Sequence, residues 1–272
     1  MHRVLAALII LICAPSSSLA WGESGHRTVA EIAAHYLSEP AAAEVHKLLG
    51  DGAHAMAEVS VWADTIIGDR PETYPWHVVQ IPRDGSQYLR ERDCQNDDCI
   101  VGKIPEFVRL LGDRTVATQL RVEALQFLIH FVGDLHMPLH AFVGLNRYKS
   151  GAWLRIGETT DKLHLWWDNE FVDQLGFDSS ELATTLSGQI TADEREQWKK
   201  GTPEDWANES FRIAHAFVTK YGLIDARWDD VSEARPIVLP ASVLDEVKPI
   251  VAQRLKMAGV RLAWLLNRAF QN

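Results

Sequence analysis

Two histidine–aspartate pairs constrain this chain more than any other feature, because each pair lies inside a stretch of apolar residues. His130 and Asp134 belong to the run Phe-Leu-Ile-His-Phe-Val-Gly-Asp, and His164 and Asp168 to the run Leu-His-Leu-Trp-Trp-Asp. On a helix, residues four apart project from the same face, about one turn apart. Burying such ionisable groups without a partner is costly. The fold must therefore provide each pair with a partner.

A metal ion is the partner that this chemistry favours. Imidazole and carboxylate groups are the ligands that zinc takes when no thiolate is present. His140 follows Pro138 shortly after the first pair, where the chain must turn back, so it is a further candidate ligand. A single pair four residues apart would more simply be a capped or salt-bridged helix face. Two pairs in apolar surroundings favour a metal site over that alternative.

The spacing of apolar residues predicts a mainly α-helical fold with one small β-hairpin. No internal repeat or low-complexity linker follows the N-terminal segment, so residues 21–272 are expected to form a single domain. Ser24 is the expected cap of the first helix. Helices are predicted over 24–37, 41–49, 55–67, 104–111, 118–135, 163–175, 203–221 and 241–270, an extended segment over 74–82, an irregular one over 83–102 and the hairpin over 143–160.

The first twenty residues have the layout of a secretory signal peptide. A basic start containing Arg3 precedes an apolar run over 4–14, and small residues stand at Ser18 and Ala20. The apolar run is too short to anchor the chain in a bilayer. We expect cleavage after Ala20 and a secreted or periplasmic protein whose mature chain begins at Trp21. The alternative is an ordinary buried N-terminal helix.

The charge of the mature chain limits the ways in which it can bind nucleic acid. Without Arg3 it holds 26 basic and 37 acidic residues, a formal charge of −11. A protein that binds nucleic acid by electrostatics alone is expected to be basic. A phosphate-bearing substrate would therefore need another source of positive charge.

Cys94 and Cys99 are the two cysteines that follow the N-terminal segment. In an oxidising compartment they are expected to close a small disulfide loop. A two-thiolate metal site is the alternative, although no histidine or further cysteine lies close by in the sequence to complete it.

His26, Asp64 and His77 extend the set of candidate ligands. His26 lies five residues beyond the expected cleavage site, so the freed α-amino group and carbonyl oxygen of Trp21 could chelate a metal beside it. Asp64 and His77 each lie in tryptophan-containing surroundings. Spacing alone does not single out these last two residues.

Taken together, these motifs resemble the zinc-dependent S1/P1 nucleases. The resemblance rests on short motifs that keep the order and spacing of the family between residue 21 and residue 168. They are Trp21-Gly22, Gly25-His26, Trp62-Ala63-Asp64, Trp76-His77, His130-Phe-Val-Gly-Asp134, Pro138-Leu-His140 and His164-x3-Asp168. The C-terminal hundred residues add only helical character.

The resemblance implies a mainly α-helical domain with three zinc ions in one cleft. The first ion would be held by Asp64, His77, His130 and Asp134, the second by His140, His164 and Asp168, and the third by Trp21, His26 and Asp134. Asp134 would thus bridge two ions. Asp64 and Asp134 are the residues that we expect to be catalytic.

The implied activity is hydrolysis of single-stranded DNA and RNA to 5′-phosphorylated products, and family members often also remove 3′-phosphates from mononucleotides. Three zinc ions would change the formal charge from −11 to −5 and concentrate positive charge where the phosphate binds. No membrane anchor or protein partner is expected, and the chain is expected to be a monomer. Two alternatives remain open: a zinc phospholipase C-like phosphodiesterase, and a zinc-bound relative with weak catalysis that acts as a binding module.

Four positions depart from what is common in the family. Ile67 replaces a lysine or arginine, Val78 an aromatic residue, Gln80 an aspartate or asparagine, and Ser150 an asparagine. Gln80 and Ser150 are the expected substrate-binding residues. Gln80 can orient a water molecule but cannot take its proton, so slower turnover is expected. Arg70, Arg147 and Lys149 are candidates to replace the missing cation.

Overall fold

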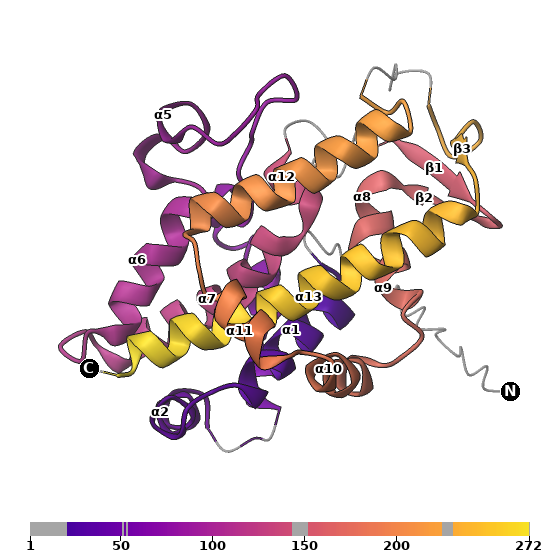
Figure 1. Ribbon diagram of the computed structural model, residues 1–272. Coiled ribbons are helices and arrows are strands. Elements are labelled where there is room, and N and C mark those ends of the chain that lie inside the picture. The colour runs from indigo at the N-terminus through magenta and orange to yellow at the C-terminus, as the bar shows by residue number, and fades with distance from the viewer. Residues whose placement is uncertain (1–20, 51, 53, 143–151, 225–230, 272) are drawn as a thin grey trace, which may run out of the picture.

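The computed structural model describes residues 21–50, 52, 54–142, 152–224 and 231–271, and its architecture is mainly α-helical (Figure 1). The central element is α7 (Thr118–His136), which packs against α1 (Glu23–His35), α6 (Ile100–Gly112), α12 (Pro203–Lys220) and α13 (Ser242–Ala269). Every residue of α7 from Phe127 to His136 is buried. A helix that is buried on all sides forms the core of the domain, which explains why the ionisable residues on it are buried as well.

The remaining elements are short and lie around this bundle. The helices are α2 (Glu39–Leu49), α3 (Ala55–Val59), α4 (Trp62–Thr65), α5 (Arg90–Asp93), α8 (Leu163–Leu165), α9 (Phe171–Asp173), α10 (Ser179–Gly188) and α11 (Ala192–Trp198). The 3₁₀ turns are η1 (Pro71–His77), η2 (Gln95–Asp97) and η3 (Pro138–Ala141), and η4 (Trp166–Glu170) is a π-helical turn.

The two helices at the ends of the chain pack very closely. A Cβ atom at Gly259 of α13 would lie 2.4 Å from Cγ2 of Ile32 on α1. Only glycine permits this approach, and α1 packs against α13 (Figure 1). The contact holds the N-terminal helix, which carries His26, against the core.

A small three-stranded sheet lies at one end of the bundle (Figure 1). β1 (Trp153–Ile156) pairs antiparallel with β2 (Thr159–Lys162), Trp153 opposite Lys162. On its other side β1 pairs in parallel with β3 (Ile237–Leu239), Leu154 opposite Ile237. The predicted hairpin is thus confirmed over its second half, whereas residues 143–151 lie outside the described residues. The third strand was not predicted, because its partner is more than eighty residues away in the sequence.

The helices predicted over 41–49, 118–135, 203–221 and 241–270 are confirmed to within two residues at each end. The helix predicted over 163–175 is present as α8, η4 and α9 in succession. The short helix predicted over 104–111 begins four residues earlier, at Ile100. α10 and α11 were not predicted, although Asp178 caps the first and Thr191 forms a capping box with Glu194 in the second.

Three local predictions are wrong. Ser24 does not cap the first helix, which begins at Glu23 after Gly22. The segment 74–82 is extended only after His77, because η1 continues to that residue. The helix predicted over 55–67 is broken between α3 and α4. Ser60 lies at the break: its hydroxyl donates to the carbonyl of Ala57, and its own carbonyl accepts a bond from a distant side chain.

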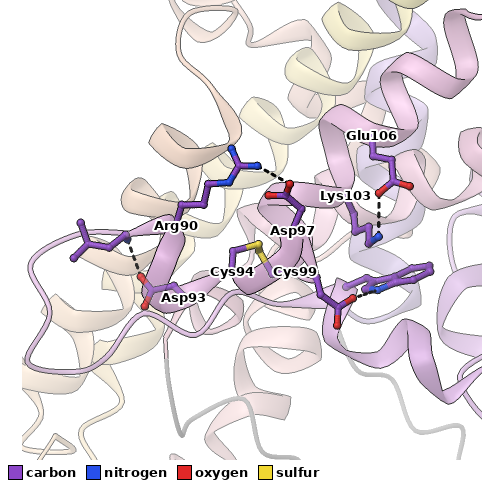
Figure 2. Close-up of a disulfide and its surroundings, with 10 residues drawn as sticks. Arg90, Asp93, Cys94, Asp97, Cys99, Lys103 and Glu106 are labelled. Carbon is purple, nitrogen blue, oxygen red and sulfur yellow. Dashed lines mark hydrogen bonds and ion pairs between the residues drawn. A yellow bond between two sulfur atoms is a disulfide. The ribbon is translucent and has the colours of Figure 1, made fainter.

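The disulfide between Cys94 and Cys99 is confirmed, with Cα atoms 5.3 Å apart. Figure 2 shows the bridge closing a tight loop in which Arg90 reaches over to Asp97. Asn96 and Asp97 have positive φ angles of 57° and 59°, which these residue types tolerate better than most. None of the helices in the described part of the chain is long and apolar enough to cross a membrane.

Candidate metal centre

Four candidate ligands from three segments meet beside α7. The helix itself presents His130 and Asp134 one turn apart, α4 contributes Asp64, and η1 ends at His77. The Nδ1 atom of His77 lies 3.1 Å from Nε2 of His130 and 3.0 Å from Oδ2 of Asp134. The Oδ1 atom of Asp64 lies 3.6 Å from Nδ1 of His77 and 3.4 Å from Nε2 of His130. His130 Nε2 is 3.2 Å from Asp134 Oδ2.

These separations lie near the ligand–ligand distances of a tetrahedral zinc site. With zinc–ligand bonds of 2.0–2.1 Å, the edges of a regular tetrahedron measure about 3.3–3.4 Å. The five distances above run from 3.0 to 3.6 Å. His77, His130 and Asp134 form one group that could hold a metal ion, and His26, Asp64 and His130 form another that shares His130 with it.

His26 lies on the other side of Asp134. Its Nε2 atom is 3.3 Å from Oδ1 of Asp134, whereas Oδ2 of the same carboxylate faces His77 and His130. The ring of His26 stacks on that of His130 with centroids 4.0 Å apart. A Cβ atom at Gly133 would lie 2.8 Å from Nδ1 of His26, so the ring fits against α7 only because residue 133 is glycine.

A further group consists of His140, His164 and Asp168, whose ligand atoms all lie within 4.8 Å of one another. His140 is on η3, and the other two residues lie on α8 and η4, with His164 Nε2 3.3 Å from Asp168 Oδ2. Nε2 of His140 and Oδ1 of Asp168 are buried and make no hydrogen bond to any described residue. Buried polar atoms almost always have partners, so a bound cation would complete this group.

Backbone carbonyl groups orient two of the imidazoles. Nδ1 of His130 donates to the carbonyl oxygen of Ser60 at 2.7 Å, and Nδ1 of His140 donates to that of His77 at 3.0 Å. Each bond leaves the Nε2 atom of the ring to face the candidate site. Metal-binding histidines characteristically have such a partner on their other nitrogen.

The buried charges of the site are unbalanced in the absence of a cation. Burial and the neighbouring His130 lower the pKa of His26 to about 4, so this imidazole is neutral at pH 7. Burial opposes ionisation of Asp134, yet His130 and His140 hold its pKa well below the usual range. Burial, reinforced by the charge of Asp134, raises the pKa of Asp168 well above its usual value. An ionised Asp168 therefore needs a cation beside it, and a metal ion meets that need.

Trp21 is fully buried and lies next to the group that contains Asp168. The backbone N–H of Gly22 donates to the carbonyl oxygen of Asp168 at 2.8 Å, and a Cβ atom at Gly22 would clash with Asn169. A Cβ atom at Gly25 would lie 2.9 Å from that of Trp21. The first described residues are thus tightly packed against the candidate centre.

Of the two predicted substrate-binding residues, the structure describes only Gln80. The exposed side chain of Gln80 lines a hollow of about 500 Å³ together with Val78 and part of the disulfide loop. Ser150 lies outside the described residues, as do Arg147 and Lys149. Arg70 does not serve as a free cation, because its guanidinium donates to Glu123 at 2.6 Å and to Glu72 at 3.2 Å.

Two contributors to the site were not predicted from the sequence. The carbonyl of Ser60 could not be identified, because any residue supplies a carbonyl oxygen. Gly133 was visible between His130 and Asp134, and a glycine inside a helix is a signal of close packing, although its neighbour His26 is more than one hundred residues away.

Comparison with known proteins identifies relatives of this chain. A family model described as S1/P1 Nuclease matches residues 21–271. Endonuclease 2 of Arabidopsis thaliana is 30% identical to this chain over an alignment of 297 positions, gaps included. The alignment covers 99% of this chain and 98% of that protein. Nuclease S1 of Aspergillus oryzae is 26% identical, with 97% of each chain covered, and nuclease P1 of Penicillium citrinum is 28% identical, with 91% of this chain and 97% of that protein covered. The chain therefore belongs to the S1/P1 nuclease family and is a nuclease, a hydrolase of phosphodiester bonds.

Proposed function

We propose that this chain is an endonuclease that uses three zinc ions to hydrolyse single-stranded DNA and RNA to 5′-phosphorylated products. The observation that carries the proposal is the convergence of histidine and aspartate side chains on both sides of Asp134, in the family context described above. Their donor atoms are nitrogen and oxygen in roughly equal numbers, a set that suits zinc.

Each ion has its own group of ligands in this proposal. Asp64, His77, His130 and Asp134 hold the first ion, His140, His164 and Asp168 the second, and Trp21, His26 and Asp134 the third. The division of the Asp134 oxygens supports a bridging role, because Oδ1 faces His26 while Oδ2 faces His77 and His130. The family relationship and the nitrogen and oxygen donor set favour zinc over other divalent ions.

In this proposal the side chains of the site bind the metal ions, balance their charge and orient water. Asp64, which is partly buried, and Asp134, which is fully buried, hold negative charge among the imidazoles and thereby keep the first group together. When bound, zinc ions supply Lewis-acid stabilisation of phosphate charge and lower the pKa of water towards 7. Gln80 is an amide and can orient a water molecule or a base without accepting a proton.

Charge explains how an acidic chain can attract nucleic acid. Three zinc ions would bring the formal charge of residues 21–272 from −11 to −5, and all of the added charge would lie at the buried centre. Binding would then be localised, in contrast to the diffuse attraction of a basic surface. An unpaired strand suits such a site, because its phosphates can approach the centre while its bases turn away from it.

The N-terminal segment is part of the proposal. Residues 1–20 act as a signal peptide that is cleaved after Ala20, and residues 21–272 form one secreted or periplasmic nuclease domain. The tight packing of Trp21 and Gly22 beside Asp168 supports a mature chain that begins at Trp21. Cleavage would free the α-amino group that the third ion requires.

A digestion time course tests the function. The processed protein is incubated with single-stranded DNA, single-stranded RNA, double-stranded DNA and a 3′-mononucleotide, with zinc or with a chelator, and product ends are identified by mass spectrometry. We expect chelator-sensitive cleavage of both single strands to 5′-phosphate ends, with slower cleavage of duplex. Cleavage of a phospholipid with no cleavage of nucleic acid would instead favour a phospholipase-like enzyme, and zinc binding without hydrolysis would favour a binding module.

A further inference from the structure

The turn between α7 and η3 joins the two parts of the candidate centre. Asp134 lies in the last turn of α7, and His140 follows six residues later. The backbone N–H of Met137 donates to the carbonyl oxygen of Asp134 at 3.0 Å, and that of His140 donates to the carbonyl of Met137 at 3.1 Å. The position of this turn therefore determines how far apart Asp134 and His140 lie.

The end of α7 is held by side chains from two other helices. The last carbonyl groups of an α-helix have no intrahelical donors. Here the hydroxyl of Ser210 on α12 donates to the carbonyl oxygen of Leu135, and Nε of Arg254 on α13 donates to that of His136 at 3.1 Å. Both donors are buried. The helix end is thus fixed from two directions.

The ring of His136 is fixed as well. Its Nδ1 atom lies 2.7 Å from the carbonyl oxygen of Val132, and its Nε2 atom lies 2.8 Å from Nη1 of Arg261 on α13. A guanidinium group can only donate, so Nε2 accepts and Nδ1 carries the proton. His136 is therefore locked to its own helix on one side and to α13 on the other.

Glu209 connects the two arginines. Arg261 binds both carboxylate oxygens, at 2.6 and 2.8 Å, and Nη1 of Arg254 binds one of them at 2.9 Å. Nη2 of Arg254 also donates to the hydroxyl of Ser210 at 2.8 Å. Each arginine is only 2% exposed. Buried ion clusters seldom stabilise a fold more than apolar packing would. The hydrogen bonds from this cluster to α7 therefore indicate its role better than its contribution to stability does.

We propose that Ser210, Glu209, Arg254 and Arg261, here called the α7 clamp, are positioning residues for the metal centre. They hold the carbonyl end of α7 and thereby set the separation between Asp134 and His140. The two arginines and one glutamate of the clamp have a net positive charge, which is favourable at the C-terminal, negative end of the α7 dipole. The inference rests on the proposed metal centre, because it concerns the spacing of that centre's ligands.

The test replaces one clamp residue at a time in protein expressed from the full sequence and purified after processing. Ser210→Ala removes the donor to Leu135, and alanine is compatible with the interior of α12. Arg254→Lys keeps the positive charge but lacks the fork that reaches three acceptors. The readouts are zinc content, the visible spectrum of the cobalt-substituted protein, and kcat and KM separately. We expect kcat to fall about 10-fold, as for other groups that orient metal ligands, with KM within about 2-fold and a shifted cobalt spectrum.

Lys220→Gln is the matched control. Lys220 pairs with Glu246, so this ion pair also joins α12 to α13, but it is exposed. We expect its cobalt spectrum and kcat to equal those of the unmodified protein. The proposal is overturned if both clamp variants lose only thermal stability and keep the unmodified spectrum and kcat. If the unmodified protein binds neither zinc nor cobalt, the proposed metal centre fails first and the clamp proposal fails with it.

Discussion

The carbonyl oxygen of Ser60 accepts a hydrogen bond of 2.7 Å from Nδ1 of His130, and this contact links a helix break to the orientation of a candidate ligand. Because the bond occupies Nδ1, the Nε2 atom of His130 faces Asp64 and Asp134. The same carbonyl is withdrawn from helical hydrogen bonding, and α3 ends at this point. One backbone carbonyl thus lies both at the helix break and against a candidate ligand.

Replacing Asp134 tests the bridging carboxylate. Asp134→Asn keeps the shape of the side chain but removes its charge. We expect two of three zinc ions to be lost, because both oxygens of this residue face other candidate ligands, and cleavage to fall by at least about 100-fold. Zinc is counted by elemental analysis. A variant that retains all three ions would show that Asp134 does not bridge.

Extending the chain by one residue before Trp21 tests the α-amino ligand. We expect one zinc ion and most of the activity to be lost, because the amino group becomes a peptide nitrogen and the added residue must enter a packed region beside Asp168. The control is the same extended protein after a protease has restored Trp21 as the first residue. Undiminished activity in the extended form would exclude the α-amino group as a ligand.

Gly133→Ala tests the contact between α7 and His26. The added methyl group would lie 2.8 Å from Nδ1 of His26 and must push the ring away. We expect loss of the zinc ion beside His26 and activity lowered about 10-fold.

The matched control is Gly188→Ala, since apart from its chain neighbours and the backbone of its own helix no heavy atom of the described residues lies within 4 Å of where its Cβ would be. This change is expected to leave zinc content unaltered and to stabilise α10 by about 0.5–1 kcal/mol, because alanine favours the helix more than glycine does. Equal zinc content in the two variants would contradict the role given to Gly133.

The affinity for zinc should rise with pH. Burial lowers the pKa of His130, but Asp134 and Asp64 outweigh it and raise that pKa well above the usual value. The raised pKa favours the protonated imidazole in the metal-free protein, and zinc must displace that proton. Below the pKa of His130, each proton that zinc displaces raises the zinc affinity by about 10-fold for every unit by which the pH rises. Zinc-binding titrations at pH 6, 7 and 8 measure the slope, and an affinity that does not depend on pH would contradict the prediction.

Removing the disulfide should affect stability without affecting zinc. The bridge between Cys94 and Cys99 closes a loop of only six residues, for which chain entropy predicts about 2 kcal/mol. Replacing both cysteines with alanine should lower the free energy of unfolding by that amount, measured by urea denaturation. Loss of zinc in this variant would mean that the loop also supports the centre.

Much of the fold and of the candidate site could be predicted from local pattern. The long helices follow from the spacing of apolar residues, and α7 was predicted to within one residue of its end. The pairs His130 with Asp134 and His164 with Asp168 were recognised because four residues bring side chains onto one helix face. Their burial, which the apolar neighbours indicated, is confirmed.

Local sequence patterns were enough to predict the helical class, the disulfide pair and the polar residues that need a partner, because each depends on residues close together in the chain. How those residues combine depends on tertiary packing, which places His26 against Gly133, His130 on the carbonyl of Ser60, β3 beside β1, and the α7 clamp residues of two distant helices at the end of α7. These contacts depend on the packing of whole helices and on backbone groups that every residue possesses. For that reason no local pattern encodes them.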